Sequence, residues 1–203
     1  MNNSEHDFYG KQDGERILYL VKPHPMATTF SLLKVYGVAV VISSILIILG
    51  TQIASLMTAF MALGVILFVL VAGIGTKIVM DWESREMAYI TDRRLVRFEP
   101  TTLFATNSRT LAWDEVVKVK TYPPNMIWKQ MAIGNVVVHA RTPGRPDEQS
   151  QNEITADDII LKDVYFYRDL GNYIDKILYT YKQLPAEIMN IRPFVPKKKG
   201  ERY

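Results

Sequence analysis

The sequence contains no cysteine among its 203 residues. Disulfide bonds, thiolate metal sites and cysteine nucleophiles are therefore excluded for this chain. Only three histidines occur, His6, His24 and His139, and their spacing matches none of the usual zinc signatures. The glycine-rich phosphate-binding motif and the nucleophile-elbow motif are also absent. We therefore expect no enzyme, no metal site and no cofactor.

The net charge is small, at +3. No basic helix and no aromatic-basic module accompanies it, so we do not expect nucleic acid as a partner. A mildly basic chain suits the anionic cytoplasmic leaflet of a bilayer better. The adjacent acids Asp147-Glu148 and Asp157-Asp158 lie in or beside a polar stretch, and we interpret them as solvated loop charge.

Charge is nearly missing from two long stretches. Residues 31–50 contain one charged residue, Lys34, and residues 56–80 also contain one, Lys77. Each stretch approaches the ~20 apolar residues that a helix needs to cross a hydrocarbon core. Neither has the polar stripe of a soluble amphipathic helix, which disfavours a pair of buried core helices. We predict a two-helix transmembrane hairpin over residues 30–80, preceded by an N-terminal segment at residues 1–29.

The flanks of the hairpin predict its orientation. The connection at residues 51–55 is short and uncharged, so the helices run antiparallel and both termini lie on one side. Basic residues flank the open end: Arg16, Lys22, Lys34, Lys77, Arg85, Arg93 and Arg94. The positive-inside rule places that end in the cytoplasm, and Trp82 fits an interfacial anchor. The helices contain no acidic residue, which argues against an ion pathway.

Small residues in the two stretches allow close helix packing. They are Ala39, Ser43, Gly73, Gly75 and Thr76. Such residues let helix backbones approach each other, either within the hairpin or between protomers. The sequence does not separate these two possibilities.

Beyond Trp82 the apolar period changes from helical to two residues, which is typical of strands. The expected strands are 87–91, 95–98, 103–106, 116–122, 136–140 and 159–161, and residues 14–22 form an extended stretch before the hairpin. We expect a turn at residues 99–102, because Pro100 cannot continue a central strand. Residues 141–156 are polar and lack periodicity, so we expect a mobile loop there.

The chain's last periodic segment predicts an amphipathic helix from about Tyr167 to Leu184. Its apolar residues follow the i, i+3, i+4, i+7 spacing of one buried face, and Pro185 ends it. The predicted soluble domain therefore spans residues 82–185 and is mainly β, capped by this helix. A basic tail follows at residues 186–203.

Several of these segments resemble the bacterial pleckstrin-homology-like family of membrane-flanked, or YdbS-like, domains. The residues that carry the resemblance are Glu15–Tyr19 with Pro23-His24-Pro25, Tyr89–Leu95, Leu111–Val119 and Gly134–Val138. Glu99-Pro100 and the long polar loop depart from the family pattern. The resemblance implies a membrane α-hairpin plus a mainly-β PH-like barrel, capped by a C-terminal amphipathic helix, and it implies no enzymatic activity.

The motif Thr91-Asp92-Arg93-Arg94 has two interpretations. Asp92 and Thr91 suit a tight turn, and one of the two arginines can form a structural ion pair. Alternatively, a basic hairpin near a membrane could bind a phosphate-bearing headgroup. The residues for such an anionic-lipid site would be Arg93, Arg94, Lys118, Lys120 and the tail lysines Lys197, Lys198 and Lys199.

The apolar stretch Met126–Met131 also has two interpretations: it packs in the core, or it is an exposed contact for a bilayer or a partner. Beyond the bilayer, we expect a protein partner or a homo-oligomer. The favoured function is a non-catalytic, membrane-anchored module for protein interaction or self-assembly at the cytoplasmic face. The alternative is an anionic-lipid headgroup-binding module, and an unrecognised enzyme or transporter component is a third hypothesis.

Overall fold

A computed structural model describes residues 7–52, 54–141 and 157–196. Its chain divides into two compact units. One unit is a helical hairpin, and the other contains two antiparallel β-sheets with the C-terminal helix. The structure thus has two long apolar helices and a mainly-β part, as the sequence predicts.

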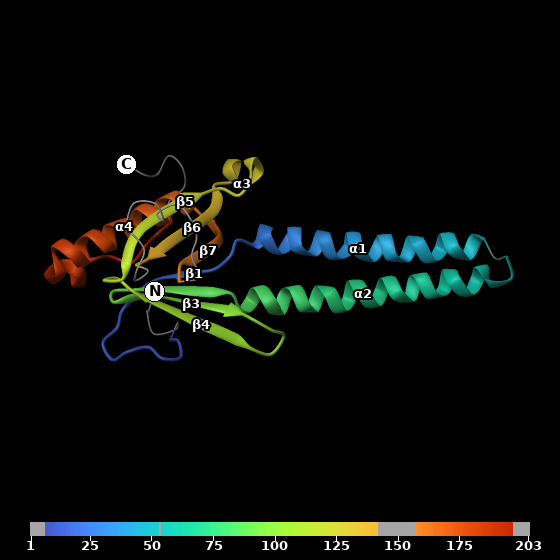
Figure 1. The fold of residues 1–203 in the computed structure, drawn as a ribbon, viewed down its shortest axis with the longest axis horizontal. Helices are drawn as coiled ribbons and strands as arrows, with labels where there is room; N and C mark the ends of the chain where they lie inside the picture. The colour runs from blue at the N-terminus through green and yellow to red at the C-terminus, as the bar shows by residue number, and fades with distance from the viewer. Residues whose placement is uncertain (1–6, 53, 142–156, 197–203) are drawn as a thin grey trace. The chain divides into compact units, whose positions relative to one another are not determined.

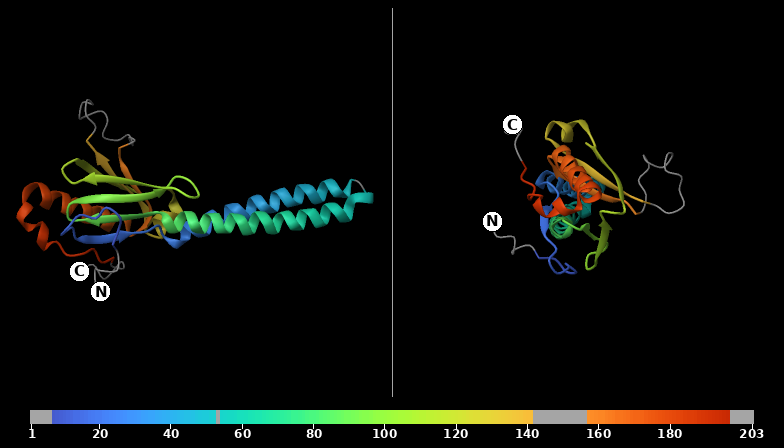
Figure 2. Two further views of the ribbon diagram at one scale, coloured as in Figure 1. Left: turned by 90° about the horizontal axis from the view of Figure 1, so that it is seen from below. Right: turned by 90° about the vertical axis from the view of Figure 1, so that its left-hand side faces the viewer.

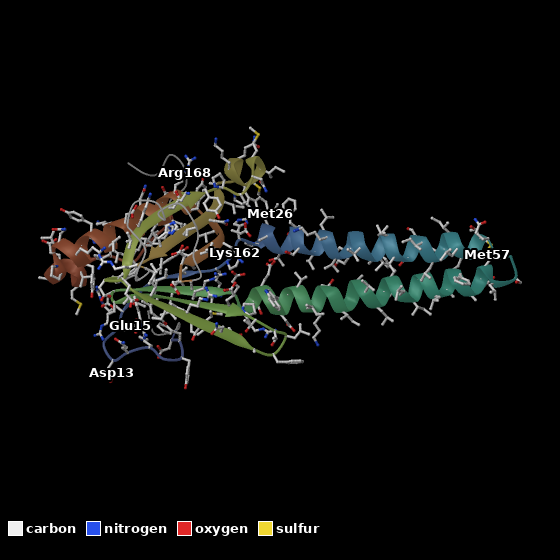
Figure 3. All side chains as sticks on the ribbon, in the orientation of Figure 1. Asp13, Glu15, Met26, Met57, Lys162 and Arg168 are labelled. Atoms are coloured by element: carbon white, nitrogen blue, oxygen red, sulfur yellow. The ribbon has the colours of Figure 1, made fainter. Side chains whose placement is uncertain are left out.

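The hairpin consists of α1 (Pro25–Thr51) and α2 (Met57–Arg85), joined through the short 3-10 helix η2 (Ala54–Leu56). The two helices lie side by side along their length (Figures 1 and 2). Met26 lies at the open end of the hairpin and Met57 at its closed end (Figure 3). Each helix is a candidate membrane span by length and composition.

The surface of the hairpin is almost entirely apolar and exposed. Only 11% and 6% of the most apolar windows of α1 and α2 are buried within the chain. A core helix of a soluble protein would be mostly covered, and exposed apolar patches of this size are rare on soluble monomers. Two such helices suggest a membrane protein.

Small residues do pack the hairpin, although not all of those expected. Ala39 and Ser43 are buried between the helices. A Cβ on Gly75 would lie 2.5 Å from a Val35 methyl group, whereas a Cβ on Gly73 would meet nothing within 4 Å. Polar contacts add to this packing: Tyr36 Oη lies 3.0 Å from Thr76 Oγ1, and Thr28 donates a hydrogen bond to Glu83.

The first sheet has four antiparallel strands in the order β1-β2-β3-β4. They are β1 (Ile17–Val21), β2 (Met87–Thr91), β3 (Arg94–Pro100) and β4 (Thr106–Ala112). Strand β1 comes from before the hairpin and pairs with β2, which comes after it. Residues 7–24, part of the N-terminal segment predicted at residues 1–29, therefore belong to the β unit.

The second sheet has three strands in the order β5-β6-β7, namely β5 (Val116–Tyr122), β6 (Ile133–Ala140) and β7 (Ile159–Tyr165). The helix α4 (Tyr167–Gln183) packs against β5 and β6. Its apolar face buries Leu170, Ile174 and Ile177 in a core that includes residues from both sheets, such as Ile90 and Val136. The amphipathic period predicted this helix to within one residue of each end.

The chain after α4 also belongs to the β unit. A 3-10 helix, η3 (Pro185–Asn190), follows, and Ile191 is buried in the core. The Phe194 amide donates to the Leu18 carbonyl at 3.1 Å, which ties this segment to β1. The part of the predicted basic tail (residues 186–203) that reaches Phe194 therefore belongs to the β unit, and residues 197–203 lie outside the described residues.

Two local predictions were wrong. Residues 99–102 do not form the turn and 103–106 do not form a strand, because β3 continues to Pro100 and β4 begins at Thr106. Pro100 is the last residue of β3, where a missing N–H costs little. The connection instead contains Leu103 and Phe104, both exposed. The expected loop at 141–156 falls almost wholly outside the described residues.

A short helix that was not predicted, α3 (Met126–Gln130), lies between β5 and β6. The Asn125 side chain caps it by accepting a hydrogen bond from the Trp128 amide at 2.9 Å. Trp128 is buried, while Met126 and Ile127 are exposed. Core packing is thus confirmed for Trp128, and a contact of Met126 and Ile127 with a bilayer or partner stays a prediction.

Candidate functional site

The turn between β2 and β3 is built around the Thr91 hydroxyl. This oxygen accepts hydrogen bonds from the backbone amides of Arg93 and Arg94, at 3.2 and 3.0 Å. It also lies 2.8 Å from a carboxylate oxygen of Glu15. A β-branched hydroxyl that satisfies two turn amides explains why threonine suits this position.

Glu15 and Arg94 form a bidentate ion pair beneath this turn (Glu15 is labelled in Figure 3). The Arg94 Nε and Nη2 atoms lie 3.0 and 2.9 Å from the two carboxylate oxygens. The Glu15 side chain is 0% exposed and that of Arg94 is 17% exposed. Fork-to-fork pairing of this kind is among the stronger charge-assisted hydrogen-bond geometries.

The environment of Glu15 favours its charged form. Burial alone raises the pKa of this carboxyl, but hydrogen bonds from Arg94, the Gln12 amide and Thr91 outweigh burial and leave the pKa lowered. The hydrogen bond with Glu15 raises the pKa of Arg94. Both partners are therefore held in their ionised states, as a structural ion pair requires.

The other two residues of the motif also bond within the chain. Asp92 accepts a hydrogen bond from the Arg16 amide at 3.0 Å. Arg93 is exposed, and its guanidinium donates to the Gln12 side chain at 3.0 Å. The interpretation as a turn with one inward ion pair is confirmed for Arg94, and Arg93 is the motif's accessible cation.

A second buried arginine was missed from the sequence. Arg97 is 5% exposed and donates to Glu86 at 2.6 Å and to Glu99 at 3.2 Å. The only sequence signal was a charged residue inside the apolar strand Leu95–Phe98, which predicts an inward-facing partner of opposite charge. Like Arg94, this guanidinium is neutralised within the β unit.

The remaining predicted cations are not brought together with the turn by any contact in the described part of the chain. Lys118 is exposed and Lys120 half-buried, and both lie on β5 in the other sheet. Lys197, Lys198 and Lys199 lie outside the described residues. Binding of an anionic lipid by these residues stays a prediction.

Of the three histidines, the structure describes His24 and His139. Over residues 7–52, 54–141 and 157–196, no cluster of three potential metal ligands occurs. His139 Nδ1 lies 2.9 Å from a carboxylate oxygen of Asp158, the residue that precedes β7, and both side chains are buried. Asp158 also accepts a hydrogen bond from the Ala140 amide at 2.9 Å. This pair fastens β6 to β7 at their ends.

A groove of about 390 Å³ lies along α4 and the segment that follows it. Its lining includes Tyr173, Lys176 and Thr180 from α4, Glu187 and Asn190 from η3, and residues 191–195. The floor is apolar where Ile191 is buried, while Lys176, Glu187 and Arg192 provide exposed charges of both signs. Neither sheet contributes to this lining, so strand periodicity gave no signal for the groove.

Tyr173 fixes one side of the groove. Its hydroxyl donates to the Arg192 carbonyl at 2.8 Å and so holds the C-terminal segment against α4. Burial raises the pKa of Tyr173 to about 12, although the nearby Arg16 opposes this shift. The phenol therefore stays protonated and remains a hydrogen-bond donor at neutral pH.

No family model matches this chain, and neither the curated proteins nor the solved structures contain a match. An assignment of function therefore rests on the sequence and on the geometry of the described residues.

Proposed function

We propose that this chain is a non-catalytic, membrane-anchored module whose β unit binds a protein, either a partner or a second copy. The hairpin α1–α2 serves as the anchor, and both termini lie in the cytoplasm. The flanking basic residues named above support this orientation through the positive-inside rule. The β unit corresponds to the PH-like barrel that the sequence resemblance implies.

The observation that carries the proposal is the groove between α4 and residues 187–195. It is open, it combines an aromatic ring with exposed charges of both signs, and its walls are held by the Tyr173–Arg192 hydrogen bond. Protein interfaces are enriched in aromatic residues and arginine, and a polar, solvent-accessible rim surrounds their packed core. Val195 in the lining and Met189 on η3 add exposed apolar surface.

The motif turn supports a headgroup site less well than it supports a structural role. Arg94 is already paired with Glu15, so a phosphate would have to compete with a buried carboxylate. The register also places Thr91 at one end of β2 and Met87, which follows α2, at the other. These two residues are four positions apart on the strand, which separates them by about 13 Å.

Co-purification of the intact chain from its own membranes tests the proposal. In mild detergent, the tagged chain should retain a stoichiometric protein partner or run as a homo-oligomer. Lys176→Glu should weaken that association because Lys176 lines the groove, whereas the matched control Lys118→Glu should not. A monomer free of any partner would refute the proposal.

Anionic-lipid binding is the second candidate. Lys118 and Lys120 are two residues apart on β5, so they share one face of that strand, and no ion pair involving either appears among the described residues. Vesicles containing anionic lipid should then bind the detergent-purified full chain more strongly at low salt than at high salt. Lys118→Glu should reduce this binding, and an absence of salt dependence would reject the candidate.

The orientation has its own test. A reporter fused after Tyr203 should be active only in the cytoplasm. A reporter signal from the outer side of the membrane would overturn the predicted orientation without affecting the groove.

A further inference from the structure

Helix α3 presents two exposed apolar side chains from a well-fixed loop. Met126 is 76% exposed and Ile127 57% exposed, although the adjacent Trp128 is buried. The loop begins with Pro123-Pro124, which restrict its backbone, and the Asn125 side chain caps the helix. An exposed apolar pair on a rigid support has a fixed direction, unlike apolar residues in a frayed tail.

Asp163, which holds α3, also holds His24, the residue before α1 in the chain. The Trp128 indole N–H donates to an Asp163 carboxylate oxygen at 2.6 Å. The His24 amide donates to the Asp163 carbonyl at 2.8 Å, and the His24 ring contacts Tyr165, with centroids 5.2 Å apart. His24 immediately precedes Pro25, the first residue of α1.

The number of residues between His24 and the apolar run of α1 limits how far His24 can lie from the hydrocarbon core of the bilayer. The apolar run of α1 begins at Phe30, five residues after Pro25, and five helical residues rise about 7.5 Å. The headgroup layer of one leaflet is roughly 5–8 Å thick, from the difference between the full bilayer and its hydrocarbon core. His24, and with it Asp163, therefore lies at the headgroup layer once α1 spans the bilayer.

The charge of the loop that contains α3 also favours a position at the membrane surface. The loop from Pro123 to Met131 contains no acidic residue and one cation, Lys129, which is exposed. A lysine beside exposed apolar side chains is the usual combination at an anionic membrane surface, where the apolar groups enter the interface and the cation meets phosphates.

We propose that Met126 and Ile127 of α3 dock into the headgroup–acyl boundary of the bilayer that α1 and α2 cross, with Lys129 at the lipid phosphates. This inference rests on the proposed anchoring of the hairpin. The contact gives the β unit a second attachment to the membrane, beyond its two covalent links. Such an attachment limits how the unit can turn on its anchor and so orients the surfaces it offers to a protein partner.

The absence of native cysteine allows a direct test with one fluorescent label at a time on the full chain. The test position is Ile127→Cys. The matched control is Val117→Cys, an exposed apolar residue near the opposite end of β5, the strand that leads to α3. Val69→Cys, exposed in the middle of α2, reports whether the hairpin spans the bilayer. Each protein is reconstituted into vesicles of zwitterionic and anionic lipid, with a nitroxide at the headgroup or deep in the acyl chain.

The label at residue 127 should lose emission with the headgroup nitroxide, the label at 69 with the deep nitroxide, and the label at 117 with neither. Equal, weak quenching at 127 and 117 would overturn the docking of α3 while leaving the anchor intact. Blue-shifted emission at 127 without quenching would mean that protein covers α3, which also overturns it. Absence of quenching at 69 would refute the anchor itself and the docking with it.

Discussion

The buried pair of Glu15 and Arg94 makes an asymmetric prediction about stability. Removing Arg94 by Arg94→Met leaves a fully buried carboxylate without its main partner. Breaking a buried ion pair from one side costs about 3–5 kcal/mol, and this site falls in that range because Glu15 has no route to water. Removing Glu15 by Glu15→Gln should cost less, about 1–3 kcal/mol, because Arg94 is partly exposed and glutamine keeps an acceptor for Thr91.

Urea unfolding of the β unit in mild detergent measures both values. Trp113 reports this region, because its indole N–H donates to the Thr91 carbonyl at 3.0 Å and its side chain is buried. The reasoning predicts a larger loss of unfolding free energy for Arg94→Met than for Glu15→Gln. Equal losses, or losses under about 0.5 kcal/mol for both variants, would show that the pair is no better than a surface contact.

The same pair predicts a dependence of stability on pH. The folded pKa of Glu15 is lowered from 4.5, so the unfolded state binds more protons than the folded state near that pH. The stabilisation is thus fully present above about pH 4.5 and is lost as pH falls through the folded pKa. Glu15→Gln should flatten the dependence of the unfolding free energy on pH in this acidic range. An unchanged dependence there would contradict its attribution to Glu15.

Three further substitutions test two other contacts. Trp128→Phe removes a hydrogen bond to the Asp163 carboxylate and should lower the free energy of unfolding by about 1.5–3 kcal/mol in the same urea assay. An unchanged free energy of unfolding would contradict this contact between α3 and Asp163. Gly75→Ala places a methyl group against Val35 and should lower the midpoint of helix loss on heating in detergent, while Gly73→Ala has room and should not. Equal midpoints for the two glycine variants would contradict the packing of the hairpin.

The parts of the fold that the sequence predicted are those with a strong local period. The two apolar runs and the single buried face of α4 repeat over many residues, so a helix is the only element that fits them. Strands β2, β5 and β6 carry enough apolar residues to be recognised. Strand β4 does not, because all of Thr106–Thr110 is exposed and no apolar alternation results.

The candidate site was predictable only in part. The motif at Thr91 signalled a turn with one inward arginine, and its partner Glu15 was named for its place in the family-like segment, but no local pattern joins two residues 79 positions apart. Arg97 gave only the weak signal of a charge within an apolar strand. The groove depends on residues 187–195 returning along α4, and this path is set by Ile191 and Phe194 packing on the core.

The most direct test of the proposed function is photo-crosslinking from the groove in intact membranes. A benzophenone amino acid replaces Lys176 in the full chain, and a second protein carries it at Lys118 as the control. The proposal predicts a protein adduct of defined mass from position 176, retained in the membrane pellet after alkaline carbonate washing, and none of that mass from position 118. Only lipid adducts from position 176, or release of the chain by carbonate, would contradict a membrane-anchored protein-binding module.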